Sequence, residues 1–197
     1  MIKSISNRRS IRKFKDTAIP KEMIEEILNA GRLAPSSKNR QPWKFTVVSG
    51  QSKNDMLLSM KQGLLREREG VPQLPNSKQH LAGAEYTLEI MEQAPITVFV
   101  TNPLGIELSD HLNQEDRIYE ICNSQSIGAA MENMTLTATE LGLGSLWICD
   151  IYFAYEELSR WLNTEGTLTA AMSFGYSDEC PRPRPRKNME DVVEWRV

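Results

Sequence analysis

The stretch Ala34-Pro-Ser-Ser-Lys-Asn-Arg-Gln-Pro-Trp-Lys-Phe45 joins a predicted amphipathic helix to a predicted apolar strand. Its first proline ends the helix, because the residue before a proline is disfavoured in the α region. Between the two prolines, the side chains offer both hydrogen-bond donors and acceptors: Ser36, Ser37, Asn39 and Gln41. A polar surface turn is one interpretation. The density of polar groups between two fixed points, followed by Trp43, favours a loop that holds a ligand.

Outward from this loop, helices and strands alternate along the chain. Upstream, apolar residues recur at helical spacing over residues 21–33, with Gly31 either a point of close packing or a fraying end. Strands are predicted at 44–49, 96–101, 145–149 and 168–174, and further helices at 123–141 and 154–162. Four or five strands interleaved with helices predict an α/β or α+β layered domain.

Two regions lack a clear pattern. A helical stripe runs from Met56 to Leu64, but glycines and prolines then interrupt the sequence, and only a short helix at 82–91 is predicted before the next strand. We predict that residues 64–93 form an excursion over the domain and a candidate lid, since long irregular segments in compact domains are commonly functional. Residues 102–120 are polar and predict no element.

The composition limits the class of protein. At 197 residues with 40% hydrophobic content, residues 1–197 can form a single domain with a full core. The net charge is -3, which gives no general electrostatic case for nucleic acid or an acidic membrane. Three widely spaced cysteines and two distant histidines argue against a disulfide framework and a metal site. With no apolar signal segment or membrane-length run, we expect a soluble cytoplasmic protein.

Cations gather near the start of the sequence, in Arg8-Arg9-Ser10-Ile11-Arg12-Lys13. In an extended segment Arg8, Ser10 and Arg12 share one side. Guanidinium groups and a hydroxyl suit the oxygens of a phosphate. A merely solvated basic face is the alternative.

The C-terminal region repeats the basic character in Pro181-Arg-Pro-Arg-Pro-Arg-Lys187, where alternating prolines predict a stiff extended segment. An apolar group follows it: Met189, Val192, Val193 and Trp195. This group is too large to leave in water, so it should pack on its own core or on another subunit.

Several familiar sites are unsupported: the sequence has no GxGxxG, no P-loop, and no credible Ser-His-Asp or Cys-His arrangement. It offers instead cations near both ends, the polar loop after Ala34, and a glycine-rich turn before the strand at 145–149. That inventory fits a bound phosphorylated cofactor better than acid/base chemistry by the protein.

Five motifs, in order, resemble the nitroreductase family of FMN-dependent oxidoreductases. They lie at 8–14, 34–43, 140–145 (Glu-Leu-Gly-Leu-Gly-Ser), 174–176 (Phe-Gly-Tyr) and 183–187. The resemblance covers nearly the whole chain and is weakest at 64–93 and 102–120. It implies an α+β, three-layer fold with a mostly antiparallel sheet flanked by helices. It also implies an intertwined homodimer with FMN at the interface, in which the arm formed by residues 181–197 wraps the partner.

The resemblance also implies roles for individual residues. Those matching the phosphate positions are Arg8, Ser10, Arg184 and Arg186; Arg9 and Gln41 lie within the same motifs and are assigned to the FMN site. Arg12 matches a cation near the flavin pyrimidine, where it would stabilise negative charge on the reduced ring. The loop lent by the partner subunit matches Pro35, Ser36, Ser37 and Asn39. The strand whose backbone faces flavin N5 matches Trp147 and Ile148.

The activity implied is NAD(P)H-dependent reduction of a small organic acceptor (a nitroaromatic, quinone, flavin or enone) by a ping-pong cycle on one open flavin face. In such a cycle the protein only has to orient the reactants and stabilise charge, so no catalytic side chain and no metal are predicted. The alternative is a non-catalytic or regulatory FMN- or nucleotide-binding protein on the same fold. Nothing in the sequence selects the acceptor, or NADH over NADPH.

Overall fold

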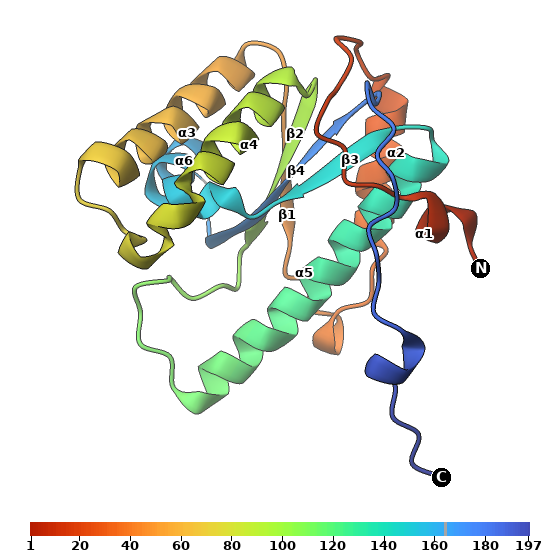
Figure 1. Ribbon diagram of the computed structural model, residues 1–197. Coiled ribbons are helices and arrows are strands. Elements are labelled where there is room, and N and C mark those ends of the chain that lie inside the picture. The colour runs from red at the N-terminus through yellow and green to blue at the C-terminus, as the bar shows by residue number, and fades with distance from the viewer. Residues whose placement is uncertain (164) are drawn as a thin grey trace.

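A computed structural model of the protein describes residues 1–163 and 165–197. In this part of the chain four strands form one antiparallel sheet in the order β1-β2-β4-β3 (Figure 1). The strands are β1 (Lys44–Val48), β2 (Ile96–Asn102), β3 (Gly144–Ile148) and β4 (Thr167–Gly175). Central strand β2 is buried along its whole length, and β1 and β3 are the edges.

Helices cover both faces of the sheet (Figure 1). On one face lie α3 (Ser52–Glu69), α4 (Leu81–Gln93) and α6 (Tyr155–Leu162), and on the other α2 (Lys21–Arg32) and α5 (Gln114–Glu140). The shorter helices are α1 (Lys3–Asn7) and the 3-10 turns η1 (Ser37–Asn39), η2 (Pro75–His80), η3 (Asp150–Ala154) and η4 (Met189–Asp191). The predicted α+β fold of three layers with an antiparallel sheet is confirmed.

The sheet divides the core into two parts, as the period of two along a strand requires. In β2, Phe99 points to the cluster under α3, α4 and α6, whereas Val98 and Val100 point to the cluster under α2 and α5. Methionines fill much of both layers, among them Met56 and Met131. Their unbranched side chains suit irregular gaps between helices and sheet.

Gly31 is a point of close packing between α2 and α5, which decides between its two interpretations. A Cβ at this position would lie 2.8 Å from both Cγ and Sδ of Met134 and 3.2 Å from the ring of Phe45. Met134 is itself fully buried. The glycine therefore allows α2 to approach α5, and α2 in turn delivers the loop after Ala34.

The long helix α5 begins at Gln114, well before the predicted start at Asn123. Its true start carries a recognisable cap: the Asn113 side chain accepts a hydrogen bond from the backbone N–H of Asp116 at 2.9 Å. The first turns of α5 are largely solvent-exposed and polar. Apolar periodicity could not reveal them, because little of this part of the helix packs on the sheet.

The predicted excursion over 64–93 is shorter than expected. Helix α3 continues to Glu69, and α4 begins at Leu81 and buries Ala84, Ile90 and Met91 in the core. Only residues 70–80 lie outside these helices. A lid role for that stretch stays a prediction.

Candidate functional site

The two basic segments of the sequence meet in space. They line a cavity of about 330 Å³, which we call the arginine pocket. The lining residues come from residues 5–12 and 181–186: Ile5, Ser6, Arg8, Arg9, Ser10, Arg12, Pro181, Arg182, Pro183, Arg184 and Arg186. The N-terminal segment and the segment after β4 run side by side in Figure 1. Segments more than 160 residues apart in sequence thus build one site.

Backbone hydrogen bonds fix the N-terminal wall of this pocket to the sheet. The N–H of Ile11 donates to the carbonyl of Ser145 on β3 at 3.0 Å, and the N–H of Lys15 donates to the carbonyl of Tyr176 at 2.9 Å. Gly144 permits the approach, since a Cβ there would lie 2.8 Å from Ile11. The wall is therefore part of the sheet edge rather than a loose tail.

Glu179 clamps the same segment from the C-terminal side. Its carboxylate accepts hydrogen bonds from the backbone N–H groups of Arg12 and Lys13. The N–H of Asp178 also donates to the carbonyl of Lys13 at 2.9 Å. Sequence reasoning missed Glu179, because a carboxylate that binds distant backbone leaves no motif of its own.

The arginine pocket is strongly positive. Among the lining residues that the structure describes, six are arginines and none is an aspartate or glutamate. Arg8 lies 4.0 Å from Glu132, which is the one ion pair that the structure describes for these arginines. Uncompensated guanidinium groups around one cavity favour a bound anion, and a phosphate can accept several of their N–H groups at once.

Several of the residues assigned to the FMN site line this one cavity: Arg8, Arg9, Ser10, Arg12, Arg184 and Arg186. Arg182, which was not assigned to the site, belongs with them. The alternation of proline and arginine could have indicated Arg182, since all three arginines of that run line the cavity. The Arg9 guanidinium is partly engaged, donating to the carbonyls of Ser6 at 2.9 Å and Arg8 at 2.7 Å.

The polar loop after Ala34 has an unusual backbone. Lys38, Asn39 and Gln41 all have positive φ angles, of 54°, 53° and 49°. Side chains rarely adopt this left-handed region outside glycine, and such strain clusters at functional sites. The sequence could not reveal it, since none of the three is glycine.

Contacts with α5 and within the loop hold this conformation. The Gln41 N–H donates to Ser36 Oγ at 3.0 Å, and the Ser37 N–H donates to Ser126 Oγ on α5 at 3.2 Å. The Arg40 guanidinium also lies 4.7 Å from the centre of the Tyr119 ring, a cation–π contact. The loop is thus presented on the surface of α5 in one fixed shape.

The loop and the arginine pocket do not meet within one chain. None of the assigned loop residues, Pro35, Ser36, Ser37, Asn39 and Gln41, lines the arginine pocket.

The two assigned residues on β3 also lie outside the arginine pocket. Trp147 projects from this edge strand with 42% of its surface exposed, between buried Leu146 and Ile148. The Ile148 side chain faces the core, so only its backbone is available to a ligand.

No nucleophile or metal cluster stands out near these groups. Partial desolvation, together with the Asp150 carboxylate, raises the pKa of the surface-exposed Cys149 thiol that follows β3, so this thiol stays protonated at neutral pH. Among residues 1–163 and 165–197, no group of three or more His, Cys, Asp or Glu side chains could hold a metal ion. Nor does any helix in those ranges combine the length and apolar character needed to cross a bilayer.

Comparison with known proteins gives one consistent result. Residues 5–176 match the model of the Nitroreductase family. A Bacillus subtilis (strain 168) protein provisionally named NAD(P)H nitroreductase YfkO is 30% identical over 198 residues, covering 87% of this chain and 86% of that protein.

Solved structures share the fold. The FMN-dependent nitroreductase NfnB from Mycobacterium smegmatis, solved in complex with NADPH, superposes with a TM-score of 0.75 at 20% identity, covering 99% of this chain and 97% of that chain. A provisionally named nitroreductase from Desulfovibrio desulfuricans in complex with FMN gives 0.70 at 26% identity, covering 99% and 96%.

Proposed function

The chain belongs to the nitroreductase family, and from that premise we propose that it is an FMN-dependent oxidoreductase that uses NAD(P)H to reduce a small organic acceptor. The observation that carries this proposal is the arginine pocket, where six arginines from both ends of the chain surround one cavity and the described part of the chain contributes no lining carboxylate. A relative with the same fold, 26% identical, is known in complex with FMN.

The residues of the pocket fit the phosphate of FMN. A phosphate monoester carries close to two negative charges at neutral pH. Arg8, Ser10, Arg184 and Arg186 would hold its oxygens with charge-assisted hydrogen bonds. The anchoring of the N-terminal wall to β3 keeps Arg8 and Ser10 in place before the ligand arrives, which lowers the entropy cost of binding.

We propose that a second copy of the chain completes the site. The loop at 36–41 is fixed and strained, yet it lies outside the arginine pocket of its own chain. Supplied by the partner in a homodimer, Ser36, Ser37 and Asn39 would reach the same FMN. The arm at 181–197 would then wrap the partner, as the exposed apolar side chains Val192 and Trp195 support.

When bound, FMN would supply the redox chemistry of a ping-pong cycle, in which NAD(P)H is the hydride donor and a small organic molecule is the acceptor. The protein would orient the flavin and its reactants and would stabilise charge on the reduced ring. Arg12 would stabilise negative charge near the pyrimidine end of the ring, and Trp147 with the Ile148 backbone would contact the ring from β3. No side chain is assigned a proton-transfer role.

A visible absorption spectrum of the purified protein, followed by anaerobic addition of NADH and then NADPH, tests this function. We expect a yellow protein that bleaches with at least one donor. A protein that stays yellow would favour the alternative, a regulatory flavin-binding role. A colourless protein that cannot be reloaded with FMN would overturn the proposal.

A further inference from the structure

A second cavity, of about 560 Å³, shares no residue with the arginine pocket. Three separate segments form its walls: Gln73 and Leu74, residues 107–109, and the start of α6 with η3. Two tyrosines, Tyr152 and Tyr155, lie in the last of these walls, so we call it the tyrosine cavity. We propose that the tyrosine cavity binds a small aromatic amine in its protonated form.

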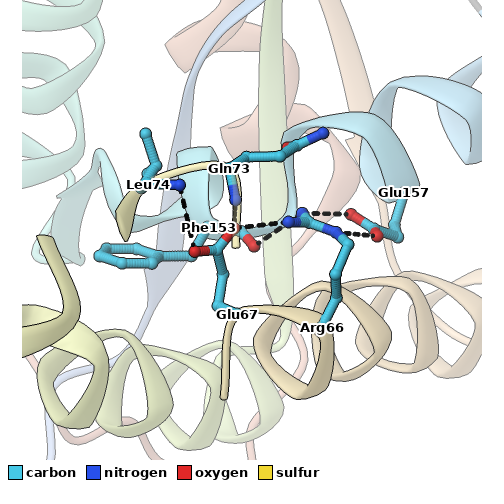
Figure 2. A network of polar contacts seen from close by, with 6 residues as sticks. All are labelled: Arg66, Glu67, Gln73, Leu74, Phe153 and Glu157. Carbon is cyan, nitrogen blue, oxygen red and sulfur yellow. Dashed lines mark hydrogen bonds and ion pairs between the residues drawn. The ribbon is translucent and has the colours of Figure 1, made fainter. Parts of the chain in front are cut away.

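The first argument is that polar contacts tie the walls together. The Arg66 guanidinium on α3 binds Glu157 on α6 at 2.8 Å and also pairs with Glu67 (Figure 2). The Glu67 carboxylate, 5% exposed, accepts hydrogen bonds from the backbone N–H groups of Gln73 at 2.8 Å and Leu74 at 3.2 Å. One network therefore fixes the Gln73–Leu74 wall relative to α6.

The third wall is tied to α6 as well. The Tyr155 hydroxyl donates to Glu107 Oε2 at 3.2 Å, which links residues 107–109 to the first turn of α6. The Tyr152 hydroxyl donates to the carbonyl of Thr169 on β4 at 2.8 Å. All three walls are thus held in place by side-chain hydrogen bonds.

The Arg66 network serves to position the cavity walls rather than to add to the free energy of unfolding. Buried ion pairs commonly gain little net stability, because removing the charges from water offsets their attraction. Burial acts to raise the pKa of Glu157, but the hydrogen bonds from Arg66 outweigh it and lower that pKa. Glu157 therefore keeps its charge beside Arg66 at neutral pH, and the clearest effect of the network is to hold residues 73 and 74 as a rigid wall.

The chemistry of the lining selects the ligand. The rings of Tyr152 and Tyr155 stack 6.1 Å apart at 17°, which presents an aromatic wall, and Leu74 and Leu108 add apolar surface. Such a lining favours a flat hydrophobic ligand.

The charge of the lining selects a cation. Glu107 and Glu156 are its charged members, and neither lysine nor arginine is among the lining residues that the structure describes. Burial raises the pKa of Tyr155 to about 12, so its hydroxyl remains a donor to Glu107 and adds no negative charge. Two carboxylates beside tyrosine faces attract an ammonium group and repel a carboxylate.

Calorimetric titration of the purified holoprotein with 2-phenylethylamine, protonated at neutral pH, and with phenylacetate tests this proposal. We expect millimolar binding of the amine and none of the acid. The double variant Glu107→Gln with Glu156→Gln should bind the amine about tenfold more weakly, as loss of two attracting charges predicts. The control Glu89→Gln, on the exposed side of α4, should bind like the wild type.

Two results would overturn the site: amine binding that the double variant retains, or no preference for the amine over the acid, including no binding of either. The variants lie outside the arginine pocket, so their flavin content should equal that of the wild type. Because calorimetry detects binding directly, the result does not depend on the proposed redox activity. A wild type that binds the amine but carries no flavin and cannot be reloaded with FMN would leave this site intact and overturn the proposed function.

Discussion

At the scale of single residues, the arginine pocket was largely predictable. The alternation in Arg8-Arg9-Ser10-Ile11-Arg12 places side chains on one side of an extended segment, and the Pro-Arg run repeats that spacing. What the sequence could not reveal is the contact between the two runs. That contact depends on Glu179 and on backbone pairing with β3, which are long-range hydrogen bonds without a local pattern.

A second residue-scale feature, Tyr155, predicts a dependence on pH. Its pKa is raised to about 12 by burial and by the Glu107 carboxylate, so the folded protein keeps the proton longer than the unfolded chain. The resulting stabilisation is present below about pH 10, the ordinary tyrosine value, and is lost as pH rises through about 12. Urea unfolding at a series of alkaline pH values should show a steeper loss for wild type than for Tyr155→Phe. Parallel curves for the two proteins would contradict the assignment.

At the scale of elements, the α2–α5 contact depends on one glycine. Gly31→Ala would place a Cβ 2.8 Å from the buried Met134 side chain. We expect it to lower the free energy of unfolding by about 1–3 kcal/mol, as overpacking does. Thermal or urea denaturation measures the effect.

Gly83 on α4 provides a matched control for that experiment. A Cβ there meets nothing within 4 Å. Gly83→Ala should therefore stabilise the protein, by up to about 1 kcal/mol, because it reduces the freedom of the unfolded chain and favours helix. Equal effects of the two substitutions would refute the close contact at Gly31.

Helices and strands were predictable from the sequence where their residues pack on the core, and not where they are exposed. The strands were predictable, since β2 and β4 are almost entirely buried and mostly apolar. The first turns of α5 and the end of α3 were not, because exposed charged helix carries no apolar stripe. The left-handed backbone at Lys38, Asn39 and Gln41 was equally invisible, being imposed by contacts with α5.

At the scale of the whole molecule, the C-terminal arm has no core of its own. Val192 is 59% exposed and Trp195 is 82% exposed, at the end of a segment that extends away from the body of the domain (Figure 1). Burying such a side chain contributes roughly 1.5–3 kcal/mol. The prediction that this group packs on another subunit follows, since it does not pack on its own.

The assembly can be tested by light scattering after size exclusion. The wild type should have twice the mass of one chain, and Val192→Ser with Trp195→Ser should shift toward the single-chain mass at low concentration. The control, Glu194→Ser with Arg196→Ser, removes an exposed ion pair from the same arm and should leave the dimer unchanged. A wild-type monomer, or an apolar double variant as dimeric as the control, would contradict the proposed arm.

The central claim is that the arginine pocket holds the phosphate of FMN. Titration of flavin-stripped protein with FMN and with riboflavin tests it most directly, because the two ligands differ only in that phosphate. We predict that FMN binds at least about a hundredfold more tightly, as two or more charge-assisted hydrogen bonds imply. The difference should shrink markedly in Arg8→Ala with Arg186→Ala, but not in the control Lys61→Ala with Arg160→Ala, which lies outside the pocket. Equal affinity of the wild type for FMN and riboflavin would contradict the account.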